Sequence, residues 1–236
     1  MKKIGTVESC YQDKFGTPRQ PGLAPSSQAR IRIDKEWQPE AALEGLSDFS
    51  HLWVIFEFHQ NTNKTYHAKV HPPRLGGKPM GVFATRSPHR PNSIGLSLVK
   101  IEKVEGDSVW ISGVDLVEGT PVLDIKPYLP DIESVPQALL GWTSKAEEKT
   151  ISIEWSPEQV SLVSQWAEKI QKPQLRQLIE ETLCLDPRPL VYRGYEGETS
   201  PYRETHAVRI YDGDIHFSFK NPQVIEIKKI LIKSLV

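Results

Sequence analysis

Short β-rich runs separated by proline and glycine fill the first 142 residues, where long helical periods are scarce. One such run covers residues 52–58, and two more cover 95–104 and 108–116, joined by a three-residue turn typical of an antiparallel hairpin. Another short run covers residues 122–125. Many short strands without a regular alternation of strand and helix favour a barrel or sandwich over a doubly wound sheet. We therefore predict an all-β domain over residues 1–142.

A different pattern begins after the polar, aperiodic segment 143–150. Ser156 and Pro157 supply an N-cap hydroxyl and an N1 proline, and apolar residues that include Trp166 then recur at helical spacing. A second helix can begin at Pro173, and a hairpin with a third strand can follow over residues 208–232. We predict a smaller α+β domain over residues 150–236 and expect Trp166 in its core.

Bulk composition excludes several classes of protein. Hydrophobic residues make up 38% and charged residues 25%, and no apolar run approaches the ~18 residues that span a bilayer, so we expect no membrane embedding. The N-terminus lacks the apolar segment of a secretory signal, which predicts a cytoplasmic protein. Cys10 and Cys184 are far apart and neither has a CxxC partner, so neither a disulfide framework nor a thiolate zinc site is indicated.

Charge is distributed unevenly along the chain although the formal net charge is only −1. No acidic residue lies between Glu57 and Glu102, a stretch that holds seven lysines and arginines together with four histidines. A second acid-free stretch runs from Lys14 to Ile33. If these stretches converge, they form a positive surface suited to phosphates or RNA. The alternative is that loop composition is uneven by accident.

Several common ligand motifs are missing. The sequence has no GxGxxG after a strand and no GxxxxGKS/T loop, which disfavours a Rossmann-type dinucleotide or S-adenosylmethionine site and a P-loop. His67 and His71 have the spacing of helix-borne metal ligands, but the glutamate of HExxH is absent and Pro72-Pro73 breaks a helix directly afterwards. We therefore predict no metal site.

The densest signal is a proline-braced loop over residues 81–95. Because prolines hold such a loop at low entropic cost, Arg86, His89, Arg90 and Asn92 can be presented in a fixed geometry that suits anion or base recognition. The alternative is a barrel corner whose arginines face solvent. A second rigid loop, over residues 15–22, places a guanidinium beside an amide, a pair that can bind a carboxylate or a purine edge.

A third signal is Asp124-Ile125-Lys126-Pro127-Tyr128 at the end of a strand. Its order of acid, proline and aromatic ring is similar to the DPPY-like loop of amine-directed adenine methyltransferases, in which a polar acceptor binds the amine and the ring stacks on the base. A turn with a packed tyrosine is the competing interpretation.

Taken in order, these strings resemble the TrmO family, also known as YaeB or VirR-like proteins, over nearly the whole chain. The matching blocks are FGTPRQPGL, HLWVIFEFHQN, HPPRLGG, GVFATRSPHRPNSIGLS and GTPVLDIKPYLP, while LCLDPRP is similar to the bacterial C-terminal extension. One departure is Ser93, where the family pattern has proline after the asparagine. A serine there should loosen the turn slightly and leave a site intact.

The resemblance implies a mainly β protein whose seven-stranded antiparallel barrel binds S-adenosylmethionine outside the Rossmann framework. It implies a homodimer with the cofactor near the subunit interface. The implied reaction is methyl transfer to the amine nitrogen of N6-threonylcarbamoyladenosine at position 37, next to the anticodon of a threonine tRNA.

Site residues follow from the same resemblance, residue by residue. The implied cofactor site consists of Pro18, Arg19, Gln20, His59, Gln60, Arg86, Leu96, Val122, Leu123, Asp124 and Ile125. Among the candidate catalytic groups, Asp124 would accept a hydrogen bond or proton, Lys126 would bind the substrate carboxylate or a phosphate, and Tyr128 would stack or orient. The implied RNA contacts are Arg74, Arg90 and Asn92 in the acid-free region, assisted by the C-terminal domain, and an anticodon loop suits such recognition.

Two other functions stay open at this level. The same basic loops could belong to a non-enzymatic RNA-binding barrel that binds no methyl donor. A phosphate-ester hydrolase using His89 and the arginines is a weaker alternative, because the sequence offers no carboxylate cluster that would hold a water-activating metal.

Overall fold

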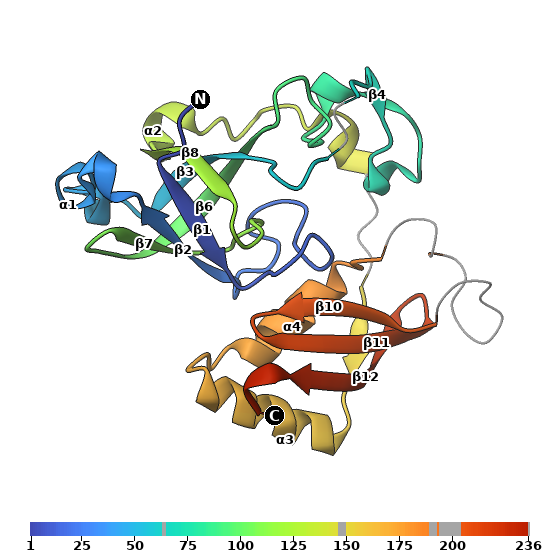
Figure 1. Ribbon diagram of the computed structural model, residues 1–236. Helices are drawn as coiled ribbons and strands as arrows, with labels where there is room; N and C mark the ends of the chain where they lie inside the picture. The colour runs from blue at the N-terminus through green and yellow to red at the C-terminus, as the bar shows by residue number, and fades with distance from the viewer. Residues whose placement is uncertain (63–64, 146–149, 189–192, 194–203, 236) are drawn as a thin grey trace. The chain divides into compact units, whose positions relative to one another are not determined.

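A computed structural model describes residues 1–62, 65–145, 150–188, 193 and 204–235 (Figure 1). The chain forms two compact units. The first contains Met1–Glu8, Arg30–Ile111 and Gly119–Glu148, and the second contains Ser9–Ala29, Ser112–Glu118 and Lys149–Val236. The segments 9–29 and 112–118 thus group with the C-terminal part of the chain, whereas the sequence pattern places both within residues 1–142.

Six strands close an antiparallel barrel in the order β1-β2-β7-β6-β3-β8. Their bounds are β1 Gly5–Ser9, β2 Gln28–Ile33, β3 His51–Glu57, β6 Ile94–Glu105, β7 Ser108–Ser112 and β8 Pro121–Pro127. The resemblance implied seven strands. The described part of the N-terminal region has two further strands, β4 (Lys69–Val70) and β5 (Met80–Gly81), but each is two residues long and they pair with each other. They therefore form a separate hairpin outside the barrel wall.

Strand β3 shows why this sequence forms a barrel wall. Leu52, Val54 and Phe56 are buried and alternate with less buried residues, as expected for a strand that has one face on a core. β3 pairs antiparallel with β6 on one side and with β8 on the other. Opposite Phe56, a side chain on Gly95 would place its Cβ 2.2 Å from the phenyl ring, so only glycine fits there.

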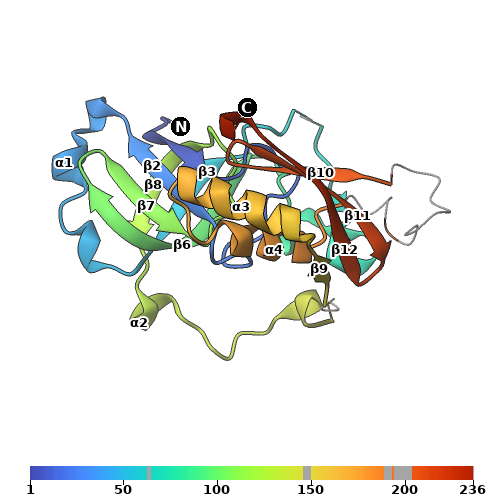
Figure 2. The same ribbon diagram turned by 90° about the horizontal axis from the view of Figure 1, so that it is seen from below.

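Short helical segments connect the strands of the first unit. Helix α1 (Pro39–Ala42) precedes β3, and helix α2 (Pro130–Glu133) follows β8. From α2 an extended segment leads to a 3-10 turn over Gly141–Lys145, as Figure 2 shows. No helix in the described ranges is both long and apolar enough to cross a membrane.

The second unit has a four-stranded sheet in the order β10-β11-β12-β9, together with two helices. The predicted hairpin and third strand are confirmed as β10 (His206–Ile210), β11 (Gly213–Asn221) and β12 (Val224–Ile232). The predicted helices are α3 (Pro157–Lys169) and α4 (Leu175–Cys184), and α3 begins with a capping box at Ser156. The sequence reading missed β9 (Ser152–Glu154), which pairs in parallel with β12.

Trp166 confirms the core assignment in this unit. Its side chain is fully buried, and its indole nitrogen donates to Asp212 Oδ1 at 2.9 Å. Gly213 leaves room for the ring, because a Cβ there would lie 2.2 Å from the indole.

Candidate cofactor and catalytic site

The candidate catalytic residues lie on the outer face of the barrel wall formed by β6, β3 and β8. Because β3 pairs with both neighbours, Ile55 is directly opposite Leu96 on one side and Asp124 on the other. Side chains directly opposite each other share a face of the sheet, so these three residues form one row. The next row on the same face contains Leu98, Trp53 and Lys126. The structure therefore brings Leu96, Asp124 and Lys126 together.

An irregularity in β8 lies at this row. Ile55 is opposite Asp124 and Phe56 is opposite Val122, so Leu123 is the extra residue of a β-bulge. Val122 is fully buried, and Ile125 is opposite the buried Val54. The side chains of Val122 and Ile125 therefore belong to the inward face. If Val122 and Ile125 contact a cofactor on the outer face, they do so through main-chain atoms.

Asp124 and Lys126 form an ion pair on the outer face. Asp124 Oδ2 lies 3.0 Å from Lys126 Nζ, and Asp124 Oδ1 accepts a hydrogen bond from the Ile125 amide at 2.9 Å. Their side chains are 46% and 64% exposed. The carboxylate is thus held in direction by two contacts while it stays accessible to a ligand.

Tyr128 ends the same face in contact with a residue that the sequence reading did not select. Its ring meets Trp53 edge to face, with 6.0 Å between ring centroids. The Trp53 indole donates to Glu133 Oε1 on α2 at 2.8 Å, and the other carboxylate oxygen of Glu133 accepts from the Leu129 amide at 2.9 Å. The alternation of β3 could have identified Trp53, since it lies on the face opposite Leu52 and Val54.

The proline-braced loop is held together by its own side chains. The Arg90 guanidinium donates from Nη1 to the carbonyls of Val82 (3.1 Å) and Thr85 (2.8 Å), and it lies over the ring of Phe83 at 5.4 Å from the centroid. Arg90 therefore has a structural role in fixing the loop. Its assignment as an RNA contact remains a prediction.

Two other segments, residues 58–61 and the turn that contains Trp142, brace this loop from outside. Trp142 donates its indole hydrogen to the Ala84 carbonyl at 2.8 Å, Asn61 Nδ2 donates to the Pro88 carbonyl at 3.0 Å, and the Phe58 amide donates to Ser93 at 2.8 Å. The segment with His59 and Gln60, both exposed, therefore runs beside the loop.

Three basic or amide residues of this region are open to solvent. Arg86 and Asn92 are exposed residues of the loop itself, and Arg74 is exposed on a 3-10 turn over Pro73–Leu75. His89 is different, because its Nδ1 is buried without a hydrogen-bond partner among the described residues. None of the described residues form a group of three or more His, Cys, Asp or Glu side chains that could hold a metal ion.

Pro18, Arg19 and Gln20 belong to the second unit. Pro18 is buried, Arg19 is exposed, and Gln20 Nε2 donates to the Arg19 carbonyl at 2.6 Å. Desolvation and the nearby guanidinium of Arg193 lower the pKa of Arg19, with the Asp186 carboxylate acting in the opposite direction. This loop therefore lies near Asp186 and Arg193 of the same unit.

The chain is similar to known proteins over nearly its whole length. The family descriptions "tRNA-methyltransferase O N-terminal domain" and "TrmO C-terminal domain" match residues 6–134 and 148–231. A Pseudomonas aeruginosa protein named "Putative S-adenosylmethionine-dependent methyltransferase RcsF" is 40% identical over 225 residues, covering 95% of this chain and 94% of that protein. The tRNA (adenine(37)-N6)-methyltransferase of Escherichia coli K12 is 40% identical over 223 residues, covering 92% and 91%. A crystal structure of TrmO from Pseudomonas aeruginosa superposes with a TM-score of 0.77 at 36% identity, covering 97% of each chain.

Proposed function

Because the chain belongs to the TrmO family, we propose that it methylates the N6 nitrogen of N6-threonylcarbamoyladenosine at position 37, next to the anticodon of a threonine tRNA. At the coarser level it is an enzyme, an S-adenosylmethionine-dependent tRNA adenine-N6 methyltransferase, and S-adenosylmethionine is its methyl donor. The observation that carries the finer proposal is the accessible Asp124–Lys126 pair on the outer wall of the barrel.

The residues of this wall suit the methyl donor. Leu96 is 48% exposed and lies beside Ile55, which gives apolar surface for an adenine ring or an aliphatic chain. Asp124 adds a carboxylate in the same row, which attracts the positive charge of a sulfonium or of an amino group. When bound, the donor supplies a methyl group already activated for transfer. The protein then has to align the reactants and manage one proton.

Asp124 is the proposed proton acceptor. A carbamoylated amine is a weak nucleophile because its lone pair is delocalised, so a positioned base is useful and typically contributes about 10²–10⁴ in rate. The backbone bond from Ile125 and the ion pair with Lys126 hold this carboxylate in one direction. Holding two reactants in line can itself contribute about 7–11 kcal/mol.

Lys126 and Tyr128 are the proposed recognition groups. The threonyl moiety of the substrate carries a carboxylate, and the Lys126 ammonium is the exposed cation of this face next to the proposed base. Tyr128 is held edge to face by Trp53, so its ring has a defined orientation for stacking on the modified base. Arg74, Arg86 and Asn92 are exposed in the acid-free region and are proposed to contact the RNA, together with the second unit.

Nucleoside mass spectrometry tests the substrate assignment. Threonine tRNA carrying N6-threonylcarbamoyladenosine should gain one methyl group with purified protein and donor, whereas the same tRNA with unmodified adenosine at position 37 should not. Equal methylation of both tRNAs would contradict the role given to Lys126. A protein that binds the tRNA but does not titrate S-adenosylmethionine would instead be a plain RNA-binding barrel.

We propose that the protein forms a homodimer and that it acts in the cytoplasm. The segment after β8 exposes four large apolar side chains, Ile132, Val135, Leu139 and Leu140, which are 67–99% exposed. A cluster of this kind typically marks an interface. We expect sedimentation to show a dimer, and Leu139→Asp together with Leu140→Asp to shift it to monomer. A wild-type monomer at all concentrations would contradict this assignment.

A further inference from the structure

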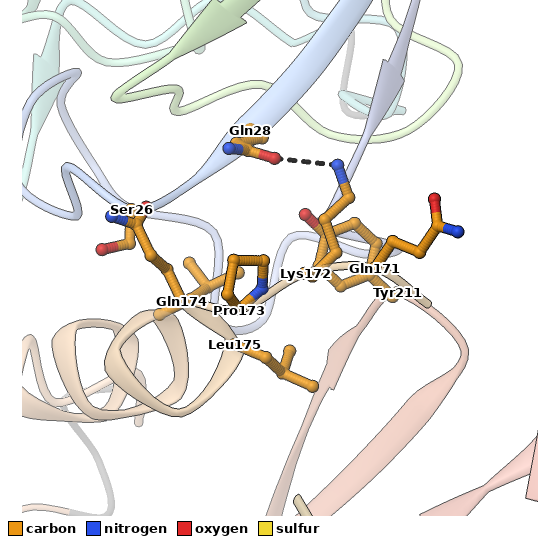
Figure 3. A pocket seen from close by; sticks show the side chains of 9 residues that line it. Ser26, Gln28, Gln171, Lys172, Pro173, Gln174, Leu175 and Tyr211 are labelled. Atoms are coloured by element: carbon orange, nitrogen blue, oxygen red, sulfur yellow. Dashed lines mark hydrogen bonds between the residues drawn. The ribbon is translucent and has the colours of Figure 1, made fainter. Parts of the chain in front are cut away.

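Two adjoining cavities are lined entirely by residues of the second unit, and none of the residues proposed for catalysis lines either of them. The first, about 70 Å³, is shown in Figure 3 and is lined by Ser26, Gln28, Gln171, Lys172, Pro173, Gln174, Leu175, Leu178 and Tyr211. The second, about 390 Å³, is lined by Gln12, Ile170, Lys172, Tyr211, Asp212 and Lys233. Lys172 and Tyr211 are common to both. The larger volume falls within the range of small-ligand pockets.

A left-handed backbone conformation lies next to one shared residue and at the other. Gln171, two residues after the end of helix α3, has a φ of +56°, and the Lys172 amide that follows donates to the Ala167 carbonyl at 2.8 Å. Tyr211 has a φ of +51° at the tip of the β10–β11 hairpin, where glycine or asparagine is the ordinary choice. Its amide donates to the Cys10 carbonyl at 2.7 Å. A large aromatic ring is therefore kept at a turn position that disfavours it.

The charges around the cavities leave cations available. Lys172 Nζ donates to Gln28 Oε1 at 2.8 Å, a bond drawn in Figure 3, and lies 5.7 Å from the centroid of the Tyr211 ring. Lys233 lines the larger cavity and is exposed. The carboxylates near these lysines already accept hydrogen bonds from other residues of the protein. Asp212 accepts from the Trp166 indole and the Ser234 amide, each within 3.0 Å.

Glu181, the acid beside the smaller cavity, is also occupied. It accepts from both the amide and the hydroxyl of Ser26, at 2.8 and 3.0 Å. The cavities therefore combine two lysines, an aromatic ring and the amide side chains of Gln12, Gln28, Gln171 and Gln174.

We propose that these cavities bind one nucleotide of the tRNA, with its phosphate at Lys172 and Lys233 and its base against Tyr211. This inference rests on the proposed tRNA substrate and adds a contact outside the catalytic wall. Lysine ammonium groups bind phosphate, aromatic rings stack on unpaired bases, and amide side chains pair with base edges. An unpaired nucleotide supplies all three of these partners.

Fluorescence anisotropy with labelled threonine tRNA tests the proposal on the full-length protein. Tyr211→Gly removes the ring and suits the positive φ, so this variant should fold, melt no lower than wild type, and bind tRNA about tenfold more weakly. Lys172→Gln should weaken binding and lower the slope of log affinity against log salt by about one unit. Lys229→Gln is the matched control, because Lys229 is an exposed lysine of the same unit that lines neither cavity.

The outcomes separate this inference from the proposed function. Loss of tRNA affinity in Tyr211→Gly and Lys172→Gln, with the control unchanged and the rate at saturating tRNA retained, supports the site. Wild-type affinity and salt slope in both variants would overturn it, even if wild-type protein methylates tRNA normally. Binding of free AMP that is lost in Tyr211→Gly while tRNA affinity stays intact would also overturn it, because the ligand would then be a free nucleotide. Wild-type protein that binds tRNA but does not methylate it would count against the proposed function alone.

Discussion

Two acid–base pairs in this protein have nearly the same separation and opposite surroundings. Asp124 and Lys126, on the barrel wall, lie 3.0 Å apart and are 46% and 64% exposed. Asp186 and Arg188, in the second unit, lie 2.8 Å apart and are 6% and 3% exposed. Exposed pairs contribute little to stability, whereas breaking a buried pair strands a charge away from water. The environment therefore decides whether such a pair is open to a ligand or is part of the folded core.

The buried pair is part of a larger network. Arg193 Nε lies 3.2 Å from Asp186 Oδ2, and the Arg188 guanidinium lies 3.3 Å from the centroid of the Phe219 ring. Burial alone would raise the pKa of Asp186, but hydrogen bonds and charge from Arg188, with the charge of Arg193, outweigh it and lower the pKa. On the barrel wall, by contrast, Asp124 is available to a ligand.

The largest expected effect is on catalysis at the exposed pair. Asp124→Ala should lower turnover by about 10²–10⁴, because it removes the proposed proton acceptor. Its unfolding free energy should change by less than about 0.5 kcal/mol, as for other surface substitutions. Turnover is measured at saturating tRNA and donor. Glu105→Ala is the control, since Glu105 forms an exposed pair with Lys103. Full turnover in Asp124→Ala would remove this carboxylate from the mechanism.

The next effect is on stability at the buried pair. Asp186→Asn should lower the unfolding free energy by about 3–5 kcal/mol, because Arg188 would stay buried without its counter-charge. Asparagine tolerates the φ of +50° at this position, so the backbone should not add to the loss. Urea denaturation measures the change, and Glu226→Gln, which weakens partly exposed pairs with Lys228 and Lys220, is the control. Equal losses in the two variants would refute the distinction drawn from burial.

A third test measures how the stability contributed by Asp186 depends on pH. Because the pKa of Asp186 is lowered on folding, its contribution to stability is fully present above its unfolded value of about 3.9 and is lost as pH falls through the folded value. The difference in unfolding free energy between wild type and Asp186→Asn should therefore shrink as pH falls below about 4. Urea titrations at several pH values measure it. A difference that is constant from neutral pH to pH 3 would show that Asp186 does not act through its charge.

The smallest expected effect is on stability at the exposed pair. Lys126→Gln should change the unfolding free energy by less than about 1 kcal/mol, because solvent screens the interaction with Asp124. Thermal and urea unfolding against wild type measure this. A loss as large as that of Asp186→Asn would mean that the wall pair also stabilises the fold.

Local sequence patterns predicted the elements that local physics determines. The β-rich run over residues 52–58 predicted a strand, which the structure confirms as β3 (His51–Glu57), and Ser156-Pro157 marked the start of α3. The resemblance selected Asp124 and Lys126, which the structure places on one face of the wall.

Features that depend on distant partners escaped the sequence reading. Strand β9 has three residues, and it is a strand because β12 pairs with it in parallel. Arg90 also fixes its own loop, because its guanidinium donates to two carbonyls there, and the sequence did not indicate this structural role. The grouping of residues 9–29 with the C-terminal unit likewise depends on tertiary contacts, such as the bond between Tyr11 and Thr182. No periodicity within a single segment carries this information.

The bulge in β8 affects the direction of the Asp124 carboxylate without affecting which side chains of the strand face the core. Removing Leu123 would return β8 to plain alternation. Val122 would still face the core and Asp124 would still face outward, so the hydrophobic pattern of the strand would be unchanged. The strand would nevertheless straighten and lose the extra twist that a bulge introduces, and the carboxylate would point elsewhere. A shortened chain of this kind is expected to fold and melt like its parent, while the direction of the Asp124 carboxylate changes and the proton transfer proposed for it is lost.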